Sequence, residues 1–293
     1  MGIHFTKEEF KERQSRVIEE LNPEVTIPDL STSHHAMNSF STRTRAMVKI
    51  QEGCNQICAY CIVPKVRGRE KSVPVQDLID QINHLSESGF KEIVLTGINI
   101  GDFGSVKDEN FLQLIMTLDN LKGIERFRIS SIEPNLLSDE VISFCADSNK
   151  FVPHFHIPLQ SGNDKILRLM KRKYDSKMYK NKIEMIKENM PDACIGADVI
   201  VGFPNESDDD FLHTVKFIDD LDIDYLHVFS YSDRDDTVAS KMENKIPRSE
   251  KLSRSRQLQI ISNKKRLKFY QNNLSMIRPV LFESILDDEH VIG

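Results

Sequence analysis

Three of the chain's five cysteines lie within eight residues, as Cys54, Cys58 and Cys61 in a C-x3-C-x2-C pattern. Thiolates this close together can bind one small inorganic centre, and soft sulfur ligands select iron–sulfur clusters or zinc. Closed structural zinc sites need four ligands, usually in two separated pairs, and the next cysteine or histidine here is His84. A cubane cluster held by three cysteines leaves one iron without a protein ligand. The pattern therefore predicts a cluster with an open iron, rather than a zinc knuckle that lacks a ligand or a chance grouping.

The composition is that of a globular protein that works in a reducing compartment. The chain has 293 residues, 29% of them charged and 39% hydrophobic. It has no apolar run of about 18 residues and no apolar core of a secretory signal near its start. Clustered cysteines argue against a disulfide framework, so we expect a cytoplasmic protein. The net charge of −6 argues against a general nucleic-acid coat but is compatible with a local basic face.

Residues 1–42 are expected to form a separate segment. Residues 5–21 have helical spacing and many charges, and residues 22–40 are rich in Pro, Ser, Thr and His, as in a linker. His34 and His35 could suggest a metal site, but solvent-exposed histidines in a loop are the simpler interpretation.

From residue 43 onward, predicted strands and helices alternate. Strands are expected over 46–51, 92–97, 126–131, 152–159, 193–202 and 225–231. Helices are expected over 75–88, 111–121, 138–147, 164–170, 176–189 and 207–221. About six such βα units predict an α/β fold with a parallel sheet, a partial (β/α)6 TIM-type barrel over residues 43–275. A helical pattern within 241–275 completes this domain, and residues 276–293 begin a β segment. No GxGxxG follows a strand, so a Rossmann dinucleotide site is not supported.

Polar residues follow the predicted strands at their carboxyl ends. These polar stretches are the cysteine loop, residues 96–99, 130–133 and 158–162, Asp198, and residues 231–232. In βα barrels the chemistry collects at this end of the strands. The agreement between separate segments predicts one site there.

The stretch GCNQICAYCIVP, residues 53–64, resembles the signature of radical S-adenosylmethionine (SAM) enzymes, including Tyr60 before the last cysteine. In that superfamily the open iron of a [4Fe–4S] cluster binds the amino and carboxylate groups of SAM, and the reduced cluster cleaves SAM to a 5′-deoxyadenosyl radical. The resemblance implies that Cys54, Cys58 and Cys61 hold one such cluster and that SAM is the second cofactor.

Further motifs resemble the methylthiotransferases within this superfamily. They are VRGREKS (66–72), IVLTGINIG (93–101), IPLQSGND (157–164), MKRKY (170–174), IGADVIVGFP (195–204) and HVFSYSDR (227–234). The TGIN and HVFSYS forms are most similar to the branch that acts on tRNA threonylcarbamoyladenosine beside the anticodon, because the isopentenyladenosine branch usually has GQN. The resemblance implies hydrogen abstraction from adenine C2, placement of a methylthio group there, and a second SAM as methyl donor.

The resemblance also implies which residues surround SAM. They are Tyr60, Thr96, Gly97, Asn99, Ser131, Glu133, Gln160, Arg172 and Asp198. Tyr60 would pack near the adenine, and the residues within 96–99 would line the methionine amino end. Ser131, Glu133 and Gln160 would face the ribose and reaction pocket. Arg172 would bind the carboxylate, for which a guanidinium fork is well suited, and Asp198 would form the pocket floor. No catalytic residue is assigned beyond the cluster.

Structural alternatives exist for several of these residues. Gly97 and Gly202 could be ordinary turns at strand ends, and Glu133, before a proline, could begin a helix. Arg172 could belong to a solvated basic run with its neighbours at 171 and 173. The two isolated cysteines, Cys145 and Cys194, are expected in the core.

The chain departs from the family pattern at both ends. The family carries an N-terminal domain with three more cysteines for a second cluster, and no cysteine precedes Cys54 here. The family also ends in a small RNA-binding β-barrel, the TRAM domain, and residues 276–293 resemble only its beginning. We expect a fragment or a degenerate form, which by itself cleaves SAM without completing sulfur insertion.

The resemblance implies tRNA as substrate and an electron donor such as flavodoxin or ferredoxin, with no membrane and no DNA. Two basic runs could contact RNA phosphates. The first, which flanks the cysteine loop, is Lys65, Arg67, Arg69 and Lys71, and the second, near the end, is Lys264, Lys265, Arg266 and Lys268. The second run could equally be a solvated helix face, and the acidic residues 208–210 and 219–224 are expected away from RNA. The alternatives are a ribosomal-protein aspartate methylthiotransferase, a non-catalytic RNA-binding remnant and a zinc-binding module.

Overall fold

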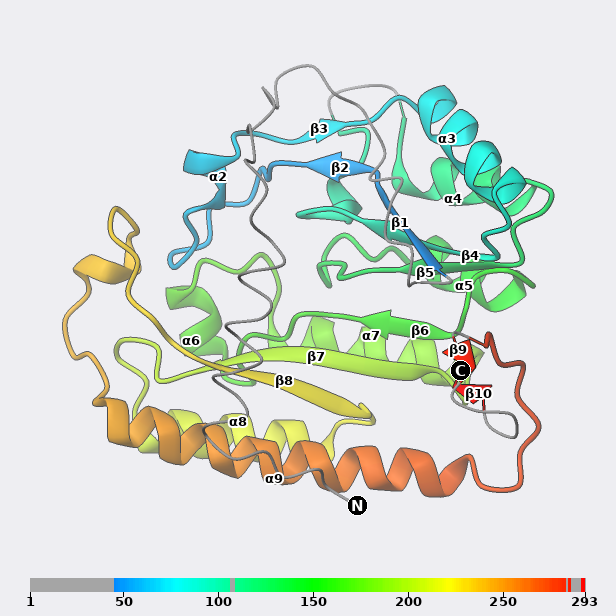
Figure 1. Cartoon of the computed structure of the whole chain (residues 1–293). Coiled ribbons are helices and arrows are strands. Elements are labelled where there is room, and N and C mark those ends of the chain that lie inside the picture. The colour runs from blue at the N-terminus through cyan, green and yellow to red at the C-terminus, as the bar shows by residue number, and fades with distance from the viewer. Residues whose placement is uncertain (1–44, 106–108, 283, 286–290, 293) are drawn as a thin grey trace, which may run out of the picture. The chain divides into compact units, whose positions relative to one another are not determined.

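A computed structural model of the chain describes residues 45–105, 109–282, 284–285 and 291–292 (Figure 1). The helix and linker predicted for residues 1–42 lie outside the described residues.

Six parallel strands form the centre of the fold, in their order along the chain. They are β1 (Arg45–Lys49), β4 (Glu92–Thr96), β5 (Arg126–Ile129), β6 (His154–His156), β7 (Cys194–Val201) and β8 (Tyr225–Ser230). Bridges between Phe127 and Phe151 and between Ser131 and His156 join the β1–β4–β5 sheet to the β6–β7–β8 sheet. Among the described residues β8 does not pair back to β1, so the barrel is open. The predicted partial barrel is confirmed.

Helices follow the strands as the sequence pattern predicts, with ends that differ by a few residues. They are α3 (Val75–Glu87), α4 (Phe111–Asp119), α5 (Asp139–Asp147), α6 (Asp164–Leu169), α7 (Ser176–Asn189), α8 (Asp208–Asp220) and the long α9 (Arg248–Asn272). Local signals set their ends. The Ser138 side chain caps α5, Ser207 and Asp210 form a capping box on α8, and Gly89 follows α3 with φ +93°.

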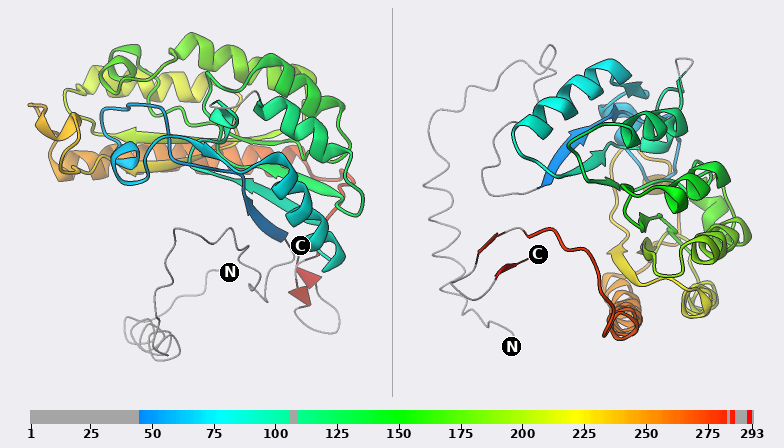
Figure 2. Two further views of the ribbon diagram at one scale, coloured as in Figure 1. Left: turned by 90° about the horizontal axis from the view of Figure 1, so that it is seen from above. Right: turned by 90° about the vertical axis from the view of Figure 1, so that its right-hand side faces the viewer.

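The helices cover one face of the strands (Figure 2). Side chains alternate along each strand, so Val48 of β1 and Leu226 of β8 are buried toward the helices. Lys49, His227 and Phe229 lie on the opposite, inner face and are exposed. The inner face of a closed eight-stranded barrel is filled with packed side chains. Here these inner-face side chains are exposed, so this part of the inner face is accessible to solvent.

The C-terminal residues include an antiparallel pair, β9 (Ser284–Ile285) with β10 (Val291–Ile292). The sequence predicted two strands with an acidic turn at 287–289 between them, and that turn lies outside the described residues. The assignment of this hairpin to a TRAM-like domain stays a prediction. Every described helix is too short or too polar to cross a membrane.

Candidate functional site: a cysteine loop at the carboxyl ends of the strands

The cysteine loop is closed at its base by a short antiparallel ladder. Strands β2 (Gln51–Glu52) and β3 (Lys71–Ser72) pair across it, with Gln51 opposite Ser72. Gly53 has φ +70°, and a Cβ there would lie 2.1 Å from the Arg69 carbonyl oxygen, so only glycine fits. The next amide, Cys54 N–H, donates to the Gly68 carbonyl at 3.2 Å. This close approach of the two chain segments fixes the position of Cys54, the first cysteine.

The far side of the loop is anchored to the barrel at Ala59, which is fully buried. Its N–H donates to the Met170 carbonyl at 2.9 Å, and its carbonyl accepts from Ala239 N–H at 2.7 Å. Ala59 also packs in a small apolar cluster with Phe203, whose ring meets the Tyr60 ring edge-on at 6.4 Å. The loop is therefore held at both ends and in the middle.

All three thiols of the loop are free, Cys54 buried and the other two half-buried. Burial raises the pKa of the Cys54 and Cys58 thiols, while hydrogen bonds from Gln56 and Arg172 oppose that rise. Sulfurs around one tetrahedral zinc ion lie about 3.8 Å apart. Among the described residues these thiols do not gather within 4.8 Å of one another. The three thiols are therefore not gathered around a single ion in the described structure.

Arg172 joins the cysteine loop to the strand ends. Its guanidinium donates to Cys58 Sγ at 3.1 Å and to the Tyr60 hydroxyl at 3.3 Å, and it forms an ion pair with Glu133. The Arg172 side chain is only 3% exposed, so the alternative of a solvated basic run is wrong. Burial raises the pKa of Glu133, and the adjacent Arg172 opposes that rise. A buried, partly neutralised pair of this kind could exchange partners with a zwitterionic ligand.

Gln51 is a positioning residue that the sequence analysis missed. It is fully buried, and its Nε2 donates to the carbonyls of Glu52 (2.9 Å) and Gly53 (2.7 Å). Its Oε1 accepts from the N–H groups of Ile98 (3.1 Å) and Asn99 (2.9 Å). One side chain thus clamps the turn after β4 onto the start of the cysteine loop. A polar residue directly after buried Ile50, at the end of the predicted strand, was the available signal.

Gly97 and Thr96 take structural parts in this arrangement. A Cβ at Gly97 would meet Ile100 Cγ2 at 2.8 Å and the Gln51 carbonyl at 3.0 Å. A glycine at this position therefore lets Gln51 approach the turn after β4. Thr96 Oγ1 donates to the Val48 carbonyl at 3.2 Å. Gly202, with φ +71°, makes the strand-end turn considered for it.

Three buried polar atoms at the strand ends have no partner within the described chain. They are Asn99 Oδ1, Ser130 Oγ and Gln160 Oε1. Buried polar groups are nearly always satisfied, so three unsatisfied atoms here point to a polar ligand. Gln160 also has φ +63°, a strained conformation for a non-glycine residue that concentrates at functional sites. The residues present therefore fit a polar cofactor such as SAM beside the three thiols.

The remaining predicted residues lie next to these. Ser131 is half-buried, and its backbone forms an isolated parallel β-bridge with His156 of β6. Asp198 of β7 lies within 3.0 Å of His156 Nε2 and 3.3 Å of His227 Nδ1, and neither histidine was expected at the site. Only the register of β6, β7 and β8 brings these three side chains together. The expected core cysteines are buried (Cys145) and half-buried (Cys194).

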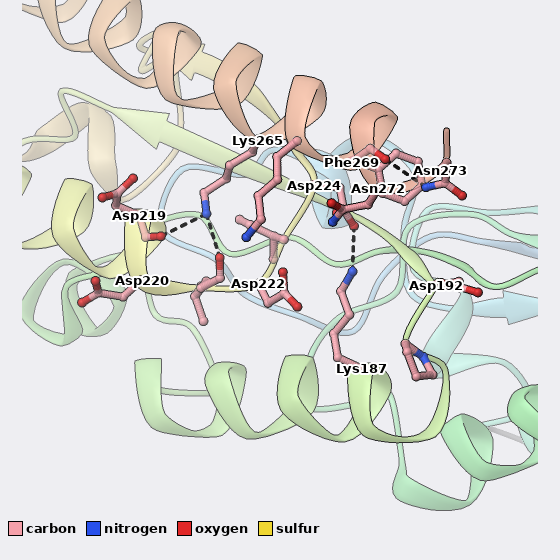
Figure 3. Close-up of a pocket in the computed structure, with 14 residues that line it drawn as sticks. Lys187, Asp192, Asp219, Asp220, Asp222, Asp224, Lys265, Phe269, Asn272 and Asn273 are labelled. Carbon is pink, nitrogen blue, oxygen red and sulfur yellow. Dashed lines mark hydrogen bonds and ion pairs between the residues drawn. The ribbon is translucent and has the colours of Figure 1, made fainter. Parts of the chain in front are cut away.

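The second basic run lies against the acidic stretch that was expected away from RNA. Figure 3 shows the pocket between them, where Lys265 donates to the carbonyls of Asp219 (3.1 Å) and Leu221 (2.7 Å). On the facing helix, Lys187 pairs with Asp224 at 3.2 Å. The carbonyl contacts hold Lys265 against the acidic stretch, while Lys264, Arg266 and Lys268 of the same run are exposed, which favours the alternative of a solvated helix face for this run.

Comparison with known proteins gives the family. The model of the radical SAM superfamily matches residues 48–218. The chain is 42% identical over 229 residues to threonylcarbamoyladenosine tRNA methylthiotransferase MtaB of Aquifex aeolicus, covering 78% of this chain and 56% of that protein. It is 38% identical over 243 residues to tRNA-2-methylthio-N(6)-dimethylallyladenosine synthase of Acetivibrio thermocellus, covering 82% and 51%. The chain thus spans about half the length of the curated relatives it matches.

Solved structures agree on the fold. Coproporphyrinogen III oxidase HemN of Escherichia coli, a radical SAM enzyme, matches with TM-score 0.56 and 17% identity over 78% of this chain and 55% of that one. The methyltransferase TsrM of Kitasatospora setae, solved with cobalamin and a [4Fe–4S] cluster, matches with TM-score 0.56 and 13% identity over 66% and 35%.

The chain belongs to the radical SAM superfamily. Membership confirms the predicted superfamily and its cofactors, a [4Fe–4S] cluster and SAM. The solved structures agree with the predicted fold class. The resemblance to methylthiotransferases is confirmed by the named relatives.

Proposed function

We propose that this chain is the radical SAM core of a tRNA methylthiotransferase that modifies C2 of N6-threonylcarbamoyladenosine next to the anticodon. Cys54, Cys58 and Cys61 hold the [4Fe–4S] cluster. When bound, the reduced cluster and SAM supply the adenosyl radical that removes hydrogen from adenine C2.

One observation supports the location of this chemistry most directly. The thiol of Cys58, the Tyr60 hydroxyl and the Glu133 carboxylate all meet the buried guanidinium of Arg172. Three unsatisfied polar atoms lie at the neighbouring strand ends. A cluster ligand, an aromatic side chain, a charged pair and unsatisfied polar atoms therefore lie together. Such groups can bind the cluster, the adenine and the charged amino-acid end of SAM.

The protein's own residues bind and orient SAM in this proposal. Arg172 turns part of its fork from Glu133 to the SAM carboxylate, and Glu133 is left to accept from the ribose or the amine. The amino end lies against residues 96–99, where Asn99 Oδ1 is a free buried acceptor. Gln160 and Ser131 face the ribose, Tyr60 packs beside the adenine, and Asp198 forms the floor.

The relatives carry the names of two different tRNA nucleosides at similar identity, and the sequence motifs support the choice between them. Matches of 42% and 41% identity carry the threonylcarbamoyladenosine name, and others of 38–42% carry the dimethylallyladenosine name. The TGIN and HVFSYS motifs favour the first group. A reductant such as flavodoxin or ferredoxin supplies the electron.

The test is nucleoside analysis of tRNA from a strain that lacks the gene. We expect methylthio-threonylcarbamoyladenosine to disappear, while methylthio-isopentenyladenosine and the methylthio-aspartate of the ribosomal protein stay unchanged. Restoring the gene as Cys145→Ala should recover the nucleoside, and restoring it as Cys58→Ala should not. Loss of the isopentenyl nucleoside or of the ribosomal modification instead would assign a different substrate. Unchanged modification of all three would favour the non-catalytic remnant.

A further inference from the structure

We propose that His156, Asp198 and His227 bind one divalent transition-metal ion, of the zinc or ferrous class, on the inner face of the strands. The three residues come from the neighbouring strands β6, β7 and β8. Their ligand atoms all lie within 4.8 Å of one another, the closest gathering of metal-ligating side chains in the described part of the chain.

The distances between the three ligand atoms are compatible with one tetrahedral ion. Ligand atoms about 2.0–2.1 Å from a tetrahedral ion lie about 3.3 Å from one another. Here Asp198 Oδ1 is 3.0 Å from His156 Nε2 and 3.3 Å from His227 Nδ1. Both imidazoles thus converge on the same carboxylate oxygen.

His227 Nδ1 has hydrogen-bond geometry toward Asp198, but the His156 nitrogen does not. His156 Nε2 is buried and, despite its 3.0 Å approach to Asp198, has no aligned hydrogen-bond partner in the described chain. A buried ring nitrogen in that position is costly unless something binds it. An ion between His156, Asp198 and His227 would satisfy the nitrogen and hold the carboxylate.

The surroundings hold the two rings in place. The Tyr225 ring lies parallel to His156, with an interplanar angle of 1° and centroids 6.5 Å apart, and its centroid is 5.3 Å from that of His227. Tyr225 reaches this position because Gly196 has no side chain: a Cβ there would lie 2.2 Å from the tyrosine ring. The Tyr225 hydroxyl contacts His154 Nε2 at 3.1 Å. Ligands carried on paired strands and packed against a fixed ring are preorganised.

The ligand set predicts the class of ion. Two imidazoles and one carboxylate suit borderline divalent metals, and three protein ligands leave at least one coordination position open. The His227 side chain is 51% exposed, so the open position is reached from the inner face of the strands. An ion here could bind an oxygen- or nitrogen-bearing group of a substrate on that face.

The test is zinc binding by the full chain after anaerobic reconstitution of its cluster, so that the loop thiols are occupied. Zn²⁺ is titrated calorimetrically without SAM or tRNA, and its ligands are read from the zinc X-ray absorption edge. We expect one Zn²⁺ per chain with only nitrogen and oxygen ligands. His227→Ala and Asp198→Asn should each weaken binding at least tenfold.

His84→Ala is the matched control, because it removes an exposed histidine from α3 and should bind zinc like the parent chain. Sulfur in the zinc shell, no zinc bound, or affinity that survives both His227→Ala and Asp198→Asn would each overturn the proposal. Asp198→Asn keeps the shape of the side chain and His227 is half exposed, so both variants should fold. Because no SAM chemistry is measured, this outcome is independent of the methylthiotransferase proposal.

Discussion

At the scale of single residues, the site depends on a buried charge shared among several partners. Arg172 is 3% exposed and Glu133 is 18% exposed, and each compensates the desolvation of the other. Removing one member of a buried pair leaves an unpaired charge, which costs more than replacing both. The same guanidinium contacts Cys58, so charge balance and the cluster ligand are linked.

Replacing Arg172 with methionine should therefore destabilise the fold and weaken cluster binding together. We expect Arg172→Met to lower the free energy of unfolding by about 3 kcal/mol, because Glu133 stays buried without its partner. The measurement is denaturant unfolding of the apo chain, followed by the iron content after reconstitution.

Arg168→Met is the control for this change, since Arg168 is exposed on α6 and its loss should cost less than about 0.5 kcal/mol. The double variant Arg172→Met/Glu133→Met should recover much of the lost stability. A double variant as unstable as the sum of the single ones would contradict the buried-pair account.

His154 gives a prediction for the pH dependence of stability. Burial, followed by the charges of Arg128 and His156, lowers its pKa to about 4. The unfolded chain binds this proton below about pH 6.5, so the folded state loses stability as the pH falls from 6.5 to 4. The full loss is about 3 kcal/mol. Unfolding of His154→Gln should show a flatter pH profile than the parent over this interval, and identical profiles would exclude the assignment.

At the scale of elements, backbone geometry at two glycines helps to position the cysteine loop. Gly53 and Gly68 both have positive φ, +70° and +77°, but their surroundings differ. A Cβ at Gly53 would collide with the Arg69 carbonyl at 2.1 Å, whereas a Cβ at Gly68 would meet nothing within 4 Å.

The two glycines form a matched pair for a test. Gly68→Ala has only the left-handed conformation to accommodate, which costs about 1 kcal/mol, and should keep its cluster. Gly53→Ala must also move the chain crossing, so we expect a loss of roughly 3 kcal/mol or more and most of the bound iron. Iron content per chain and unfolding free energy measure both effects. Equal behaviour of the two variants would mean that the crossing does not position Cys54.

The elements themselves could largely be predicted from the sequence. Apolar runs and helical spacing predicted the six strands and the helices between them, and a serine and a glycine marked the ends of α5 and α3. Contacts between elements could not be predicted in this way. The Gln51 clamp depends on how closely the turn after β4 approaches, and the His156–Asp198–His227 group depends on strand register.

At the scale of the whole described chain, the open inner face distinguishes this fold from a closed barrel. His227 and Phe229 on the edge strand β8 are exposed there, and polar groups gather at the carboxyl ends of the strands. The predicted location of the site at those ends follows from βα topology alone. The contact of Lys265 with carbonyls near the acidic residues 219–224 could not be predicted from the sequence. Charge runs in a sequence do not reveal which surfaces lie next to each other.

The most direct test of the account is SAM cleavage by the anaerobically reconstituted chain. After dithionite reduction with SAM, we expect 5′-deoxyadenosine from the parent chain and from Cys145→Ala. Cys58→Ala should give none, because the cluster loses a ligand. Absence of an iron–sulfur cluster in the reconstituted parent chain, or product that persists in Cys58→Ala, would contradict the proposal that the cysteine loop is a radical SAM centre.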